Sequence, residues 1–455
     1  MSKILIRNVK EIITMNEKRE RIKNADLLID DGKIIEMGRG LNLDQNEADR
    51  VINGRDYFLF PGLINLHHHF YQTLTRNLPD AQQVELFDWL KYLYPIWSRL
   101  TPDAVYYSTL LASAELLKTG CTTTSDQFYV FPKSQPKNLL DYEFDAAKEI
   151  GIRFHGTRGS MSLSEKDGGL PPDSVVQTDE EILKDSRRLI EKYHDNDPYA
   201  MQRVVLAPCS PFSVTEELML ESIKLAREYG VQAHTHLAET KDEEKYVLER
   251  FGMRPLAYME KLGWIGNDIW YAHGVHLNSE ELQRMADTGT GVSHCPVSNM
   301  KLSSGAARVP EMIEKGVPVG LAVDGSASND SSNMTLELKA AFLLHRLVHG
   351  MMSITAEDVL ALATNGGRDV LNQPAIGSLE IGKAADMFMI SSKRLGYAGG
   401  LYDPVSALIN TGDTQIVDYT IVNGEIVVEN GELTRVDEKE IIERANSISA
   451  EMTKE

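Results

Sequence analysis

Short runs rich in β-branched residues alternate with longer amphipathic stretches through the middle of the chain. The strand-like runs are 61–69, 122–127, 153–159, 203–209, 231–239, 268–276, 290–296 and 318–325, and the helical candidates include 103–119, 179–193, 215–229, 242–262 and 333–349. Strands that alternate with helices predict a parallel sheet. Eight such repeats predict an α/β fold, a (β/α)8 TIM-type barrel whose active site lies at the carboxyl ends of its strands.

An open, doubly wound sheet is the alternative architecture, because it also alternates strands with helices. Such a sheet usually has a glycine-rich phosphate-binding turn after its first strand. The segment PGLINLHHHFYQ contains no such turn, so the sequence favours the closed barrel.

The two ends of the chain have a different pattern, in which polar and apolar residues alternate in steps of two. An Asp-Gly pair in the first sixty residues and two Asn-Gly pairs in the last hundred fall at predicted turns. This combination predicts antiparallel strands. Because each end is short for an independent fold, we expect 1–60 and 365–455 to form one small β-sandwich domain beside a barrel of residues 61–364.

The barrel pattern is interrupted by the aromatic segment 70–101 (FYQTLTRNLPDAQQVELFDWLKYLYPIWSRLT). This segment is too long for a plain connection between a strand and a helix. We expect it to form a lid or a wall of the pocket.

Residues that can bind a metal ion or transfer protons stand at the ends of four of the predicted strands. They are, in chain order, His67, His69, His236, Glu239, His273 and Asp324. Side chains two apart in a strand point the same way, so His67 and His69 can reach one ion. Since the carboxyl ends of barrel strands open on one face, we expect the whole set to surround one site.

Several motifs give this chain a family resemblance. PGLINLHHH resembles the PGxxNxHxH signature of the amidohydrolase superfamily, and HLAE, AHGVH, SHCPVSNMKL and VDGSASND resemble later motifs of its cytosine, guanine and triazine-type deaminase branch. The resemblance extends over nearly the whole chain. It implies that the metal ligands are His67, His69, His236 and Asp324, and that the catalytic residues are Glu239, His273 and Asp324.

The resemblance also predicts the number of ions. Binuclear members of the superfamily need a carboxylated lysine after the fourth strand, where this chain has RVVLAPCSPF. We therefore expect one ion. Three histidines and one carboxylate suit Zn²⁺, and the same donors can hold Fe²⁺ or Mn²⁺. The implied reaction is hydrolytic deamination by a hydroxide that the metal activates.

Three segments resemble the 8-oxoguanine deaminase group: HHHFYQTLTR, FDWLKYLYPIW and RGSMSLSEKDGGLPPDSVV. The expected reaction is therefore 8-oxoguanine plus water to uric acid plus ammonia. A triazine, pterin, guanine or isocytosine aminohydrolase or a chlorohydrolase is the alternative within the class, and a non-catalytic barrel scaffold is a remote one. Guanine is disfavoured because Cys209 stands where guanine deaminases usually carry an arginine.

The expected substrate-binding residues are Gln72, Trp89, Arg158 and Cys209. Gln72 would pair with the base and Trp89 would stack on it; the alternative is that both only pack the 70–101 segment. Arg158 could instead pair with a carboxylate of its own loop, Glu165 or Asp167. Cys209 could be a packing residue without reactivity.

Other polar residues near the predicted strand ends have no assigned role. Gln127 stands where the 8-oxoguanine deaminase group has a histidine, and His294 and Asn299 border the mouth after the seventh strand. We expect His155 and His234 to be structural.

Composition limits the partners and the compartment. A net charge of −20 would repel a phosphate backbone, so we expect a small heterocyclic substrate and no nucleic-acid polymer. Three scattered cysteines predict no disulfide framework and a reducing compartment. No apolar run reaches the ~20 residues of a membrane span, so we expect a cytoplasmic protein. Barrels of this kind commonly associate, which predicts a homo-oligomer.

Overall fold

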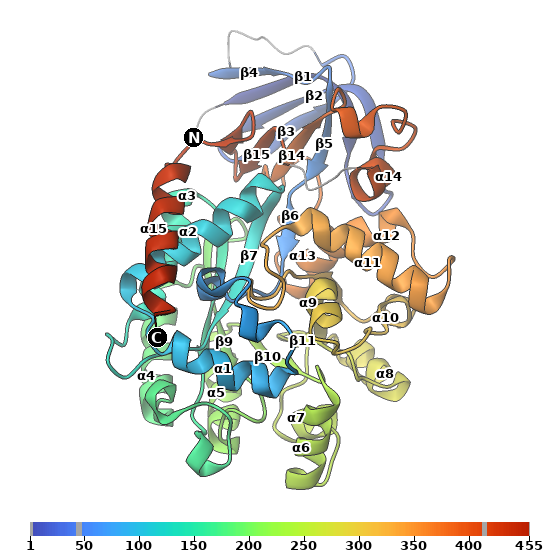
Figure 1. The fold of residues 1–455 in the computed structure, drawn as a ribbon. Helices are drawn as coiled ribbons and strands as arrows, with labels where there is room; N and C mark the ends of the chain where they lie inside the picture. The colour runs from blue at the N-terminus through green and yellow to red at the C-terminus, as the bar shows by residue number, and fades with distance from the viewer. Residues whose placement is uncertain (1–2, 42–47, 412–415, 455) are drawn as a thin grey trace.

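The computed structural model describes residues 3–41, 48–411 and 416–454. Figure 1 shows a strand-rich layer, built from both ends of the chain, above a barrel that contains the middle of the chain. The fold class predicted from the alternation of strands and helices is confirmed.

The barrel consists of eight parallel strands within the described residues, and each pairs with the next in chain order. They are β6 (Leu63–Asn65), β7 (Cys121–Phe128), β8 (Arg153–Ser160), β9 (Gln202–Pro208), β10 (Ala233–Leu237), β11 (Ile269–His273), β12 (Gly291–His294) and β13 (Val319–Leu321). The amide of Leu66 donates to the carbonyl oxygen of Leu321 at 3.1 Å. This hydrogen bond joins the chain after β6 to β13 and closes the ring.

Helices follow the strands as the periodicity predicts. The principal ones are α2 (Pro102–Lys118), α3 (Leu139–Ile150), α4 (Asp179–Tyr193), α5 (Glu216–Tyr229), α6 (Lys241–Phe251), α7 (Pro255–Lys261), α8 (Ser279–Thr288), α9 (Pro296–Lys301), α10 (Val309–Lys315), α11 (Met334–His349), α12 (Ala356–Ala361) and α13 (Gly367–Val370). The stretch 242–262, expected as one helix, is two. Gly252 has a φ of 72° and ends α6 in the left-handed conformation, and Pro255 then begins α7.

The two ends of the chain form one hydrogen-bonded sheet of nine described strands. They are β1 (Ile4–Ile13), β2 (Arg21–Asp30), β3 (Lys33–Gly38), β4 (Arg50–Asn53), β5 (Tyr57–Pro61), β14 (Met387–Ser391), β15 (Tyr419–Val422), β16 (Glu425–Glu429) and β17 (Glu432–Leu433). Antiparallel pairing of β5 with β14 joins the two ends. Ile6, Leu27 and Met387 lie in a core that belongs to this sheet.

The last helix, α15 (Glu438–Met452), packs on the barrel rather than on the sheet. Figure 1 shows it beside α2, where Lys118 Nζ lies 2.6 Å from Glu438. The Ser449 hydroxyl donates to the carbonyl oxygen of Leu74 at 2.7 Å. The small domain predicted to include residues 365–455 therefore contains a helix, α15, that packs on the barrel.

The 70–101 segment contains α1 (Leu86–Trp97) after two short 3₁₀ turns, Phe70–Thr75 and Pro79–Ala81. Trp97 is buried, and its indole N–H donates to the Thr75 hydroxyl at 3.1 Å. The rings of Phe70 and Tyr71 contact those of Phe154 in β8 and Phe128 in β7, which anchors the segment to the barrel. Among the described residues, no helix has the length and apolar character that crossing a membrane requires.

Candidate active site

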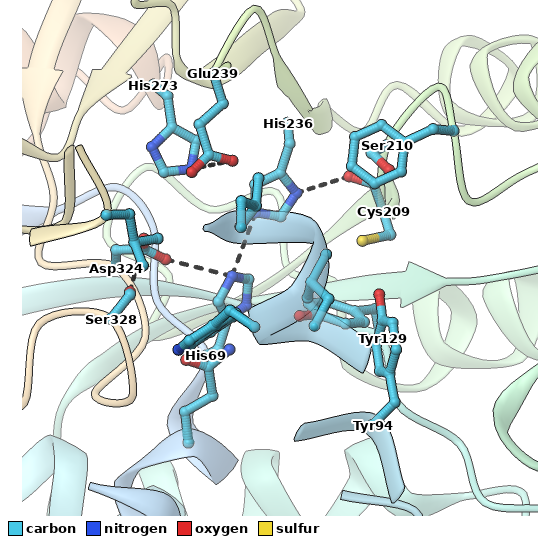
Figure 2. A pocket seen from close by; sticks show the side chains of 16 residues that line it. His69, Tyr94, Tyr129, Cys209, Ser210, His236, Glu239, His273, Asp324 and Ser328 are labelled. Carbon is cyan, nitrogen blue, oxygen red and sulfur yellow. Dashed lines mark hydrogen bonds and ion pairs between the residues drawn. The ribbon is translucent and has the colours of Figure 1, made fainter. Parts of the chain in front are cut away.

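A pocket opens at the carboxyl ends of the barrel strands. Its lining includes His69, His236, Glu239, His273 and Asp324, all expected at this face from the sequence. Figure 2 shows these side chains pointing toward one another from different strands.

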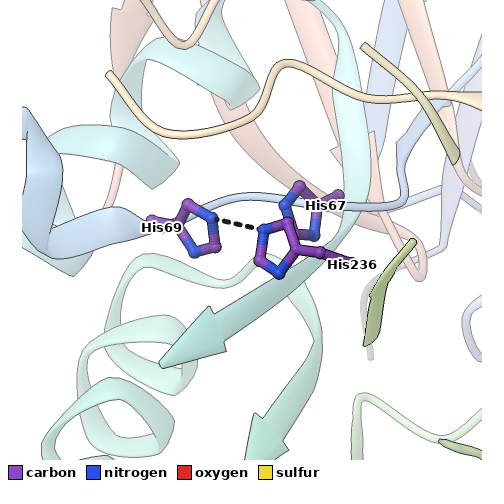
Figure 3. Close-up of side chains that lie close together, drawn as sticks. All are labelled: His67, His69 and His236. Atoms are coloured by element: carbon purple, nitrogen blue, oxygen red, sulfur yellow. Dashed lines mark hydrogen bonds between the residues drawn. The ribbon is translucent and has the colours of Figure 1, made fainter. Parts of the chain in front are cut away.

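Three histidines and one carboxylate converge at the base of the cavity. Asp324 Oδ1 lies 3.4 Å from Nε2 of His67 and 3.4 Å from Nε2 of His69. His236 Nε2 lies 3.3 Å from His69 Nε2, and Figure 3 shows the three imidazole rings together. Candidate ligand atoms of His67, His69 and His236 lie within 4.8 Å of one another, and so do those of His67, His273 and Asp324.

The second nitrogen of two of these rings is held by a backbone carbonyl. His69 Nδ1 donates to the carbonyl oxygen of Gln127 at 2.9 Å, and His236 Nδ1 donates to that of Cys209 at 2.7 Å. Carbonyl oxygens only accept, so the proton is on Nδ1 and the Nε2 lone pair faces the centre. A metal ligand needs this tautomer.

His67 is oriented by another histidine. Its Nδ1 lies 2.8 Å from His234 Nε2, and His234 Nδ1 donates to the carbonyl oxygen of Trp270 at 3.0 Å. His67 Nδ1 therefore donates to His234 Nε2, and His234 Nδ1 donates to the carbonyl oxygen. His67 Nε2 is buried and makes no hydrogen bond within the described residues. Such an atom fits a metal ligand.

The electrostatics suit a divalent cation. Burial lowers the pKa of His67, His69 and His236 below the ordinary value, so the rings are neutral. Burial alone would raise the pKa of Asp324, but the neighbouring His67 and His273 hold it well below its usual range. Three neutral imidazoles and one carboxylate form a donor set that suits zinc.

Two serines orient the carboxylate of Asp324. The Ser298 and Ser328 hydroxyls donate to its Oδ2 at 2.5 and 3.1 Å, which leaves Oδ1 toward the histidines. The sequence interpretation missed both serines, although they lie in SHCPVSNMKL and VDGSASND. Asp324 and His273 also have φ values of 65° and 72°, in the left-handed region. Such conformations of residues with a Cβ are typical of functional sites.

Glu239 and His273 face each other on the rim of the cluster. Glu239 Oε2 lies 3.6 Å from His273 Nε2, and burial raises the pKa of Glu239. Burial opposes protonation of His273, but the charges of Glu239 and Asp324 raise its pKa above the ordinary value. His273 Nδ1 donates to Asn299 Oδ1 at 2.9 Å. This contact gives Asn299, unassigned from the sequence, a place behind His273.

His294 and Gln127, the other residues without an assigned role, are not among the described residues that line the cavity. The His294 ring contacts α11, with its Nε2 3.0 Å from His345 Nε2. Gln127 contributes its backbone carbonyl to His69, and its side-chain amide donates to the carbonyl oxygen of Ala207 at 3.3 Å.

Three of the four expected substrate-binding residues line the cavity, namely Gln72, Trp89 and Cys209. Arg158 does not, within the described lining. Its guanidinium contacts Asp185 of α4 at 2.6 Å and Gln177 at 2.8 Å. It points to the helix side of β8, so the placement at the mouth is corrected, and neither carboxylate of its loop is the partner.

Aromatic side chains complete the wall. Tyr94 from α1, Tyr129 after β7 and Phe212 after β9 line the cavity and were not singled out from the sequence. Tyr94 belongs to the aromatic stretch FDWLKYLYPIW, which could have indicated from the sequence that it lines the pocket. Helix α1 thus forms one wall of the pocket, as expected for the 70–101 segment.

Comparison with known proteins identifies the family. Residues 58–427 match the Amidohydrolase family. The chain belongs to this family. The superfamily expected from the motifs is thereby confirmed, and the cluster at the barrel mouth of this amidohydrolase occupies the position predicted for its metal site.

Relatives of this amidohydrolase match it over almost their full length. It is 45% identical to 8-oxoguanine deaminase from Pseudomonas aeruginosa, over 98% of each chain. It is 38% identical to hydroxydechloroatrazine ethylaminohydrolase from Pseudomonas sp. (strain ADP), over 98% of this chain and 95% of that one. The crystal structure of atrazine chlorohydrolase from Arthrobacter aurescens TC1 complexed with zinc is similar at a TM-score of 0.93, with 32% identity over 98% and 100% of the two chains.

Proposed function

We propose that this amidohydrolase deaminates 8-oxoguanine, consuming water and releasing uric acid and ammonia. The 45% identity to an 8-oxoguanine deaminase over 98% of both chains carries the choice of substrate. The convergence of the histidine cluster with Glu239 and His273 supports the type of reaction.

We propose further that one zinc ion is bound by His67, His69, His236 and Asp324. The two groups of candidate ligands share His67, which supports a single centre. The chain after β9 offers Cys209 and no lysine, which supports the mononuclear form. The relative crystallised with zinc supports the choice of metal. Metal analysis of the purified protein tests zinc against Fe²⁺ and Mn²⁺.

Bound zinc would supply Lewis-acid activation of a water molecule, lowering its pKa from about 15.7 toward about 7. His273 and Asp324 line the pocket, where they would orient this water through hydrogen bonds. Glu239, whose buried carboxyl has a raised pKa, takes up a proton from the water and delivers it to a ring nitrogen of the substrate.

Protonation of the ring makes the carbon that carries the amino group electrophilic, and the water oxygen adds to it. His273, whose pKa is raised by the charges of Glu239 and Asp324 against the effect of burial, stabilises the charge that develops. The amino group then accepts the remaining proton of the added water, the carbon–nitrogen bond breaks, and ammonia leaves as the carbonyl forms. Each of the three residues faces the cavity in which this chemistry takes place.

The walls of the cavity support a planar heterocycle as substrate. Trp89 and Tyr94 offer aromatic faces for stacking, and Gln72 offers an amide for pairing. The Cys209 thiol is buried, and burial raises its pKa to about 12, so it contacts the substrate as a neutral group. These features suit an uncharged aminated ring.

A triazine aminohydrolase or chlorohydrolase is the second candidate, because two of the relatives above act on triazines. Zinc-loaded protein should be assayed by ultraviolet absorbance and ammonia release on 8-oxoguanine, guanine, isocytosine and hydroxyatrazine. We expect kcat/KM for 8-oxoguanine to exceed the others at least tenfold. A preference for hydroxyatrazine would establish the second candidate, and inactivity of fully metallated protein on the whole panel would favour a non-catalytic scaffold.

We also propose that the protein is cytoplasmic, binds no nucleic-acid polymer and forms a homo-oligomer. Its cysteines Cys121, Cys209 and Cys295 are buried and free, which supports a reducing compartment. Leu347, near the end of α11, is 85% exposed, and Met352, in the turn that follows, is 94% exposed, which supports association of copies. Light scattering after size-exclusion chromatography measures the oligomeric state.

A further inference from the structure

The chain makes a tight turn between β10 and α6, and this turn carries Glu239. Strand β10 ends at Leu237 and α6 begins at Lys241. Ala238 has a φ of 53°, in the left-handed region that residues with a Cβ rarely adopt. Contacts other than local preference must therefore hold the turn.

The carboxylate of Glu243, on the first turn of α6, uses both of its oxygens on this turn. The amide of Ala238 donates to Oε1 at 2.8 Å, and the amide of Glu239 donates to Oε2 at 2.9 Å. Glu243 is only 1% exposed. The two hydrogen bonds fix two successive amides of the turn, so this pair of contacts explains how the left-handed turn is maintained.

Ordinary helix capping does not account for this arrangement. In a capping box, the third helical residue accepts a hydrogen bond from the amide of the N-cap residue. Glu181 in α4 and Glu281 in α8 do this. Glu243 reaches past the N-cap residue Thr240, whose hydroxyl accepts from the Glu243 amide at 3.3 Å. Its carboxylate therefore serves the turn rather than the start of the helix.

We propose that Glu243 is a positioning residue, which holds the amides of Ala238 and Glu239 and thereby directs the Glu239 carboxylate toward His273. Figure 2 shows the resulting contact, in which Glu239 Oε2 lies 3.6 Å from His273 Nε2. A carboxylate accepts from both amides, whereas a glutamine side chain has one oxygen and would turn its NH₂ group toward an N–H donor. The inference rests on the proposed role of Glu239 in proton transfer.

The first test compares Glu243→Gln with Glu244→Gln. Glu244 lies on the same turn of α6 and pairs with Arg254 instead. In zinc-loaded protein with the preferred heterocycle of the panel, we expect Glu243→Gln to lower kcat at least tenfold, with KM and zinc content within twofold of wild type. Glu244→Gln should keep kcat within twofold. A kcat of Glu243→Gln within twofold of wild type, or a loss matched by loss of zinc, would overturn the role.

The second test adds Ala238→Gly to Glu243→Gln. Glycine adopts the left-handed conformation without the penalty of a Cβ. The double variant should therefore recover at least threefold in kcat, or in yield of active protein if Glu243→Gln folds poorly. A defect in helix capping would not respond to a glycine at this position, so the absence of any gain contradicts the positioning role.

Glu239→Gln separates this inference from the proposed function. If it loses turnover while Glu243→Gln does not, only the positioning role fails. If it keeps wild-type turnover, the proposed proton transfer fails and the inference fails with it. If both variants lose turnover, Glu239→Gln combined with Glu243→Gln should be no slower than Glu239→Gln alone, because Glu243 acts through Glu239. Additive losses would contradict this.

Discussion

His234 Nε2 lies 2.8 Å from His67 Nδ1, and this contact determines which nitrogen of His67 faces the cavity. His234 accepts the proton of His67 because its own Nδ1 already donates to the carbonyl oxygen of Trp270. A histidine outside the expected ligand set thus holds one of the expected metal ligands in the tautomer that a metal requires.

Replacing His234 with leucine should weaken zinc binding about 10- to 100-fold, because the His67 ring loses the acceptor that fixes its tautomer. Competition with a chromophoric chelator measures the affinity. His155→Leu is the matched control: His155 is equally buried in a barrel strand, but it bonds to Gln373 at 2.8 Å and not to a ligand. Equal zinc affinities of the two variants would show that His234 has no special part.

Glu239→Gln should keep the zinc content of wild type and lose nearly all turnover. Glutamine has the shape of glutamate but cannot carry a proton between water and the ring. Zinc stoichiometry and the steady-state rate are measured on the same preparation. A variant that retains more than about a tenth of the wild-type rate would contradict the assignment of Glu239 as the proton carrier.

Arg158→Met should destabilise the fold and leave substrate binding unchanged. The buried guanidinium pairs with Asp185 outside the cavity, and removing one member of such a pair costs about 3 kcal/mol. Chemical denaturation measures the loss, with the exposed Arg187→Met as control. A large rise in KM at unchanged stability would indicate that Arg158 binds the substrate after all.

The pH dependence of stability should contain a contribution from Glu337. Burial raises the pKa of this carboxyl to about 8 in the folded protein, against about 4.3 in an unfolded chain. The folded state therefore binds more protons between these values, and the contribution is fully present below the lower pKa and is lost as pH rises through the upper one.

Glu337→Gln removes this titration, so its stability relative to wild type should increase by roughly 1–2 kcal/mol between pH 6 and pH 8. Urea denaturation at a series of pH values measures the difference. The exposed Glu228→Gln should show a constant difference over the same range. A constant difference for Glu337→Gln as well would mean that the buried carboxyl is already ionised at pH 6.

The barrel was predictable because its strands and helices have different periods. The helix predicted at 179–193 is α4 to the residue, where Thr178 and Glu181 form a capping box. The stretch 242–262, predicted as one helix, is two helices. Its apolar residues keep a helical spacing across Gly252, but the backbone leaves the helical conformation there. Periodicity predicts a helix but not the element against which it packs, so the packing of α15 against α2 could not be predicted from the sequence.

Within the site, the predicted ligands come together because their positions at strand ends fix their direction. The spacing of His67 and His69, two residues apart in a strand, was sufficient to predict that both side chains point toward one site. The direction of Arg158 was not, because a strand buried on both faces gives no polar pattern that separates the barrel interior from the helix side. His234 shares a face with His236, and only the three-dimensional contact distinguishes it from an ordinary core histidine.

The pairing of β5 with β14 has a consequence for the order of events during synthesis. Strand β5 leads directly into β6 and then into His67 and His69, yet its antiparallel partner begins at Met387. A nascent chain that has emerged from the ribosome only as far as Asp324 contains every expected metal ligand but lacks the strand that pairs with β5. We therefore expect the sheet that leads into β6 to be completed only when the chain is almost fully translated.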